Sequence, residues 1–125
     1  MAEEDTKLPS IDRRVSEDFI SFYANNVMFE SSVWDLKMIF GQLDQSESGN
    51  PIINIEGSLA LPWLQAKIMS FFLQLQLAAY EHDRGTIQVP SNVLPASPDA
   101  VDTNPAFDDN IKALYRRLYS QVFAP

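Results

Sequence analysis

Residues 19–31 read FISFYANNVMFES and residues 33–43 read VWDLKMIFGQL, and these two runs decide the fold class. Both are rich in aromatic and β-branched residues, which favour strands. The second run alternates between apolar positions, among them Trp34 and Met38, and charged positions such as Asp35. A period of two predicts a strand with one buried and one solvated face.

Three strands are expected in the first half of the chain, at residues 18–31, 33–43 and 52–58. Only short polar turns separate them, and consecutive strands joined in this way form an antiparallel meander. Asn25 and Asn26 are poor strand residues and predict a β-bulge in the first strand. Both faces of that strand are apolar, so both are expected to be covered.

A long helix is expected at residues 62–82. Pro62 is tolerated in a first helical turn, and Gly85 stands where a left-handed stop residue belongs. One apolar stripe consists of Leu64, Ile68, Phe71, Phe72, Leu75 and Ala79, and a second of Met69, Leu73, Leu77 and Tyr80. Because a helix that covers a sheet needs only one stripe, the second stripe calls for another partner.

A second helix is expected at residues 105–123, with Asn104 as its N-cap. Residues 86–105 contain four prolines, the last of them at the expected helix start, and they predict an extended connector. The predicted fold is α+β: a three-stranded antiparallel meander covered by one long helix, plus a C-terminal helix on a proline-rich tether. The predicted divisions are a mobile acidic N-terminus (1–15), a β-β-β-α core domain (16–86), the connector (87–104) and a C-terminal amphipathic helix (105–125).

Composition excludes several classes of function. The 125 residues carry a net charge of -8 at pH 7, with no Cys and one His. Disulfide frameworks and cysteine-based zinc sites are therefore absent, and a nucleic-acid binder would need a basic face. There is neither a secretory signal nor a run of about 20 apolar residues, so a cytoplasmic protein that does not enter membranes is expected. We expect no cofactor and no metal.

The sequence offers little catalytic chemistry. The only histidine, His82, would need Glu81 or Asp83 to orient it as a general base, but adjacent residues on a helix point in different directions. A cation near a helix C-terminus explains His82 more simply. Neither glycine-rich phosphate-binding motif occurs. The aromatic residues lack the basic groove of a base-stacking platform and are better explained by a core or a protein interface. We therefore expect no catalytic residue and no enzyme.

The segments FYANNVMFES, FGQL and AAYEHDRG resemble a small bacterial domain family of uncharacterised function. The resemblance covers about residues 18–87. Its motif residues here are Tyr23, Ala24, Asn25, Pro62, Tyr80 and Glu81. It implies a three-stranded meander with one helix and brings no known chemistry.

A weaker resemblance is to the SecB-type export chaperones. The strand FYANNVMFES, the proline-started helix, the GTI segment with its proline-rich connector and the final helix with FDDNI look similar. This resemblance implies an acidic cytoplasmic tetramer that binds unfolded chains in apolar grooves.

Self-association is expected because a core domain of about 70 residues buries little surface while its strands and helix carry excess apolar side chains. We predict a homo-oligomer, either a dimer or a tetramer. The predicted interface residues are Phe19, Tyr23, Phe29, Leu73, Leu77, Tyr80, Ile111, Leu114 and Leu118. The predicted function is a non-enzymatic protein-interaction module of the bacterial cytoplasm, and the alternative is a SecB-like holdase for unfolded polypeptides.

Overall fold

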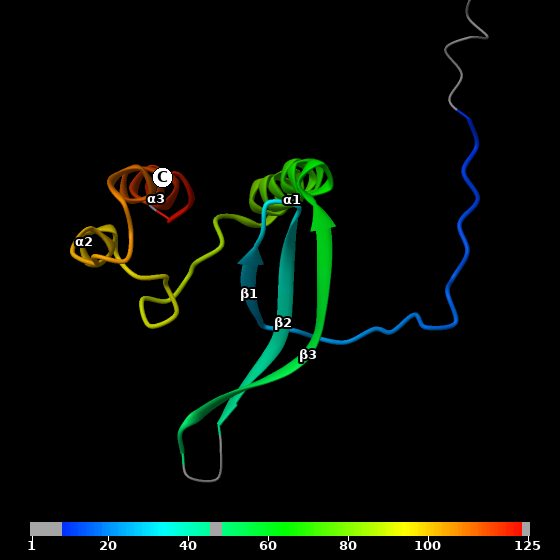
Figure 1. Ribbon diagram of the computed structural model, residues 1–125, viewed down its shortest axis with the longest axis horizontal. Helices are drawn as coiled ribbons and strands as arrows, with labels where there is room; N and C mark the ends of the chain where they lie inside the picture. Colours follow the sequence, from blue (N-terminus) through cyan, green and yellow to red (C-terminus); the bar gives the residue numbers. More distant parts are fainter. Residues whose placement is uncertain (1–8, 46–48, 124–125) are drawn as a thin grey trace, which may run out of the picture. The chain divides into compact units, whose positions relative to one another are not determined.

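The computed structural model describes residues 9–45 and 49–123 and confirms the α+β class (Figure 1). Residues 1–8 of the predicted acidic N-terminus lie outside the described part. The chain divides into two compact units at Phe71 and Phe72. The elements are β1 (Asn26–Ser31), β2 (Asp35–Gln45), β3 (Pro51–Pro62), α1 (Trp63–Arg84), α2 (Pro98–Asp102) and α3 (Asp109–Phe123).

The sheet is the expected antiparallel meander in the order β1-β2-β3. Phe29 pairs with Met38, and Met38 pairs with Leu59 on the other side. Residues directly opposite each other in antiparallel strands share a face. The register therefore gathers one apolar face from Val27, Phe29, Leu36, Met38, Phe40, Leu59 and Leu61. The alternation predicted for β2 is confirmed along this face, where Met38 is buried.

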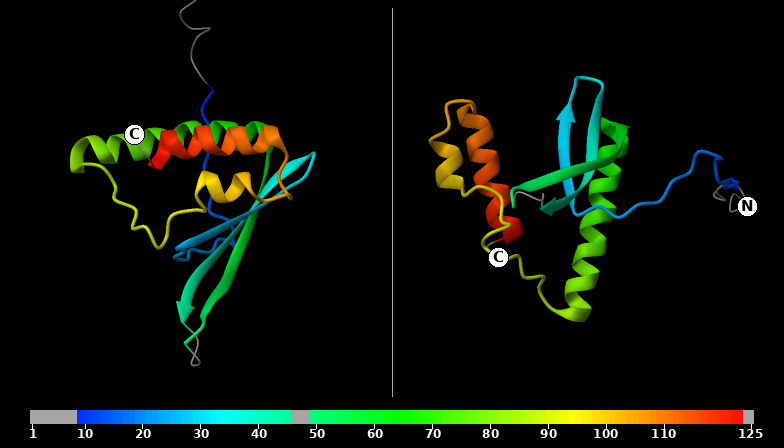
Figure 2. Two further views of the ribbon diagram at one scale, coloured as in Figure 1. Left: turned by 90° about the vertical axis from the view of Figure 1, so that its left-hand side faces the viewer. Right: turned by 90° about the horizontal axis from the view of Figure 1, so that it is seen from below.

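β2 and β3 form a hairpin that continues past the end of β1 (Figure 2). Phe40 pairs with Gly57 and Gly41 pairs with Ile55, so Glu56 is an extra residue in β3. The bulge in the β2–β3 ladder therefore lies in β3. The predicted bulge at the Asn25–Asn26 pair stays a prediction, since Asn25 and Asn26 both face Gly41 where the β1–β2 ladder begins. A β-carbon on Gly41 would come within 2.7 Å of the Ile53 Cγ2 atom, so the hairpin needs glycine there.

The first strand is shorter than predicted, because pairing begins at Asn26 rather than at residue 18. The backbone N–H of Asn25 donates to the Gly41 carbonyl (3.1 Å), and the Asn25 Oδ1 atom accepts from the Leu43 N–H (2.7 Å). The Asn25 side chain thus takes the place of the backbone carbonyl that would otherwise accept from the Leu43 N–H, and the β1–β2 ladder ends there. The preceding Phe22 meets the Phe40 ring edge to face, with centroids 6.2 Å apart.

These contacts join the two motifs that carry the family resemblance. Asn25, from the Tyr-Ala-Asn motif, binds the backbone at both Gly41 and Leu43 of the FGQL motif. Asn25 therefore has a structural role in the sheet.

Trp34 was expected on the apolar side of the second strand, and this was wrong. β2 begins at Asp35, and Trp34 lies in the preceding turn with 83% of its surface exposed. The Ser32 hydroxyl accepts from the N–H groups of Trp34 and Asp35 and so builds the turn. The Ser32 carbonyl in turn accepts from the Trp63 indole N–H (2.9 Å), which ties the start of α1 to the sheet.

β3 is longer than predicted and passes directly into α1. Pro62 is the last strand residue and pairs with Asp35, so the helix begins one residue later than expected. At the other end the predicted glycine stop is confirmed. Gly85 has a φ of 88°, and its N–H donates to the Glu81 carbonyl (2.8 Å).

A short helix, α2, occupies part of the segment that was predicted to be extended. Ser97 caps it by accepting from the Ala100 N–H (3.2 Å), and Pro98 fits its first turn. The following helix, α3, begins at Asp109 rather than Pro105. Its cap is Asp108, whose side chain accepts from the Ile111 N–H (2.8 Å), so the prediction of Asn104 as the cap was wrong.

Replacing Asn25 by Ala should destabilise the sheet. The Leu43 N–H would lose its acceptor, and loss of one such hydrogen bond costs about 1 kcal/mol. Urea unfolding followed by circular dichroism measures the change. Asn92→Ala is the control, since Asn92 is an exposed turn residue. Equal stability of the two variants would contradict the role assigned to Asn25.

Candidate interaction surface

The chain leaves most of its apolar surface exposed. Among the described residues, only Met38, Ala66 and Val101 are buried apolar residues. The large apolar side chains that stay exposed in the described residues are therefore available for binding.

Helix α1 carries the most continuous part of this surface. No charged residue lies between Lys67 and Glu81. Leu64 on one stripe is 74% exposed, and Leu73 on the other stripe is 55% exposed. The two stripes lie on nearly opposite sides of the helix. A helix that is apolar on opposite sides belongs to a buried environment, so α1 has the composition of a helix with partners on both sides.

All nine residues predicted to form the interface are exposed. Phe29 lies on the apolar face of the sheet, and Phe19 and Tyr23 lie in the segment before β1. The other six form two rows with helical spacing: Leu73, Leu77 and Tyr80 on α1, and Ile111, Leu114 and Leu118 on α3. That these residues contact a partner stays a prediction.

The C-terminal unit contains a helical hairpin, in which α2 packs beside α3 (Figure 2). Arg116 forms ion pairs with Asp99 (2.8 Å) and Asp102. Hydrogen bonds to Asp99 and Asp102 raise the pKa of the Arg116 guanidinium above its ordinary value. The Tyr115 hydroxyl donates to the Ala96 carbonyl (2.6 Å) and fixes the chain before α2.

An aromatic row runs along α3. Tyr115 stacks on Tyr119 with ring centroids 6.1 Å apart, and Tyr119 meets Phe123 at 5.1 Å. They border a small groove of about 300 Å³, lined by Pro95, Tyr115, Leu118, Tyr119, Val122 and Phe123. Sequence reasoning missed this groove, although the spacing of four between its rings was a visible signal.

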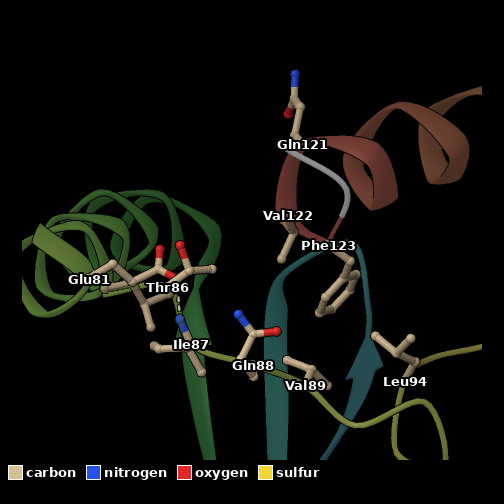
Figure 3. A pocket seen from close by; sticks show the side chains of 10 residues that line it. Glu81, Thr86, Ile87, Gln88, Val89, Leu94, Gln121, Val122 and Phe123 are labelled. Atoms are coloured by element: carbon tan, nitrogen blue, oxygen red, sulfur yellow. Dashed lines mark hydrogen bonds between the residues drawn. The ribbon is translucent and has the colours of Figure 1, made fainter. Parts of the chain in front are cut away.

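A larger hollow of about 630 Å³ lies in the same unit (Figure 3). Apolar side chains such as Leu77, Ile87 and Phe123 line it, and Glu81 is its only ionisable lining residue. The Glu81 carboxylate accepts from the Ile87 N–H (2.8 Å) and so serves the turn after α1. Acid–base chemistry needs a second positioned group, and the residues that line this hollow do not supply one.

His82 lies in the last turn of α1 and is exposed. Its neighbour Glu81 is engaged with Ile87, and the role expected for His82 as a cation near the helix C-terminus stays a prediction. Within residues 9–45 and 49–123, no three His, Asp or Glu side chains cluster in a way that could hold a metal ion. In the same residues, no helix has the length and hydropathy to cross a membrane.

Comparison with protein-family models, with curated proteins and with solved structures gave no match for this chain. Both resemblances described above therefore stay predictions.

Replacing Arg116 by Gln should loosen α2. The change removes both ion pairs that bind α2 to α3, so hydrogen exchange at the amides of Ala100 and Val101 should become faster. The difference should shrink at high salt, because exposed pairs are screened. Arg117→Gln removes the same charge from the adjacent position and is the control. Unchanged exchange in Arg116→Gln would refute this account of the hairpin.

Proposed function

We propose that this protein is a non-enzymatic homo-oligomer of the bacterial cytoplasm, a dimer or a tetramer, that binds other proteins. The proposal rests chiefly on α1, whose two apolar stripes lie exposed on opposite sides of one helix. Monomeric proteins rarely leave contiguous apolar patches of this size in water.

The magnitude of the exposed surface supports self-association. On α1 the large exposed apolar side chains are Leu64, Ile68, Phe71, Phe72, Leu73, Leu75, Leu77 and Tyr80. At roughly 100 Å² each, the five on the first stripe supply about 500 Å² and the three on the second about 300 Å², so self-association has to use both sides of α1 to reach the roughly 800 Å² that one partner contributes to a standard interface. A second copy carries the same helix, and a two-fold interface uses one patch on both subunits.

A binding role agrees better with the polar residues than catalysis does. The ion pairs of Arg116 connect helices, and the Glu81 carboxylate holds a turn. Each of these groups has a structural explanation, so none calls for a reaction.

The second candidate is a SecB-like holdase for unfolded polypeptides. The groove beside the aromatic row of α3 favours it, because Tyr115, Tyr119 and Phe123 could receive apolar side chains of many sequences. A specific partner and an unfolded client make different demands on this groove. The specific partner needs one complementary shape, whereas the client needs only apolar contact.

Self-association should depend on α1. The wild-type chain should sediment as at least a dimer of the 14.1 kDa subunit at micromolar concentration. Leu73→Glu should weaken the oligomer, because a charge would have to be buried in the interface. Gln76→Glu adds the same charge between the two stripes and should leave the oligomer intact. A wild-type chain that sediments as a 14.1 kDa species would refute the proposed oligomer.

A client-aggregation assay separates the two binding roles. A holdase should suppress aggregation of an unfolded protein at stoichiometric amounts, and Tyr119→Ser should weaken the suppression because it removes the central ring of the aromatic row. His82→Ala should change nothing in either role. Absence of suppression by the wild-type chain would reject the holdase and favour a specific partner.

A further inference from the structure

The segment before β1, residues 9–25, is called the N-terminal arm here. Its described residues form no strand or helix beyond a single turn, in which the Phe19 N–H donates to the Ser16 carbonyl (3.0 Å). The arm nevertheless carries five large and largely exposed apolar side chains: Ile11, Val15, Phe19, Ile20 and Tyr23, between 67% and 82% exposed. A segment of this kind lacks the apolar contacts that usually offset the entropy of ordering.

The last part of the arm has the composition of a strand. Residues 19–23 read FISFY, in which four of five residues are aromatic or β-branched. Disordered segments are poor in such residues. Residues 19–23 therefore have the sequence of a strand but have no strand partner within the described chain.

The sheet of the same chain cannot supply the partner. Asn25 ends the β1–β2 ladder by binding the Leu43 N–H, as described above. Before it, Phe22 lies over the apolar face, where a β-carbon on Gly57 would come within 3.2 Å of its ring. The arm therefore crosses the face from β2 to β3, out of the plane in which strand hydrogen bonds form.

The crossing directs the arm towards the β3 side of the sheet, and β3 offers an open edge. It is twelve residues long and carries Glu56 as its only charge, and within the described residues it pairs only with β2. Long edge strands with few charges readily pair with another chain, and natural proteins usually block them with lysine or proline. Here the prolines, Pro51 and Pro62, stand only at the two ends.

We infer that the N-terminal arm of each copy adds as a fourth strand to the β3 edge of a second copy, in a reciprocal exchange. This inference rests on the proposed self-association and assigns it a specific contact. Burial of the five side chains would remove on the order of 600 Å² per arm, so two arms and the edges that receive them exceed the roughly 1,200 Å² of a small stable interface. Backbone pairing would supply the register.

The test is disulfide cross-linking. Because the sequence contains no cysteine, a disulfide can form only between the cysteines that are introduced, so it identifies the two positions in contact. Full-length protein carrying Ser21→Cys is mixed with a differently tagged protein carrying Ser58→Cys or Leu59→Cys on β3. Ser58 and Leu59 are adjacent strand residues, so they sample both faces of the edge. We expect a mixed disulfide with at least one of them under mild oxidation, since paired strands bring α-carbons within bonding range.

Val33→Cys replaces Ser21→Cys in the control mixture. Val33 is 86% exposed in the turn before β2, so its thiol is accessible but outside the arm. Equal cross-linking from position 33 and position 21 would overturn the inference, because it would show random collision between exposed thiols.

Two substitutions in the full chain test backbone pairing. Ile20→Pro removes an N–H that a strand would donate, and Phe19→Asp places a charge in the arm. Each should raise the dissociation constant of the oligomer at least tenfold. The circular dichroism spectrum should stay that of the wild type because both sites are exposed. Val33→Asp is the matched charge control and should have no such effect.

The outcomes separate the inference from the function on which it rests. A wild-type oligomer that is unaffected by Ile20→Pro and shows no disulfide between position 21 and β3 would overturn arm exchange, while the proposed oligomer would stand. A monomeric wild-type chain would overturn both.

Discussion

The bond between the Asn25 side chain and the Leu43 N–H is the interaction on which the arrangement of the N-terminal unit depends. It ends the β1–β2 ladder at a defined residue, and the chain before it turns onto the face of the sheet. Phe22 then packs against Phe40 and beside Gly57 on the face of the sheet, so this part of the chain does not pair with the β3 edge. The hairpin of β2 and β3 consequently keeps one long open edge.

A second constraint is the shortage of buried surface. Met38 and Ala66 are the buried apolar residues described in the first unit, and Val101 is the one described in the second. Small domains fold alone with difficulty because too little of their surface is removed from water. Local interactions such as caps, turns and exposed ion pairs fix the elements here but add little stability. Association offers a way to supply the remaining burial, which is the physical basis of the proposed function.

The helices and the sheet present different kinds of surface. α1 offers apolar side chains on two sides, and α3 offers an aromatic row beside a groove. The edge of β3 offers backbone groups instead. Side-chain surfaces tolerate many partners, whereas backbone pairing sets orientation and register. A protein that both assembles with itself and binds others could therefore separate the two tasks between these surfaces.

The sequence by itself determined the three strands, the two longer helices, the meander, the apolar face of β2 and the glycine stop at Gly85, because each depends on periodicity or on the preference of single residues. It also identified the excess apolar residues on α1. Only the tertiary structure decided where β1 begins, where the bulge lies and that Asp108 rather than Asn104 caps α3. Those features depend on which donor meets which acceptor across the sheet or around a turn, and Asn25 and Leu43 are 18 residues apart in the chain. Local pattern holds no information on such a contact.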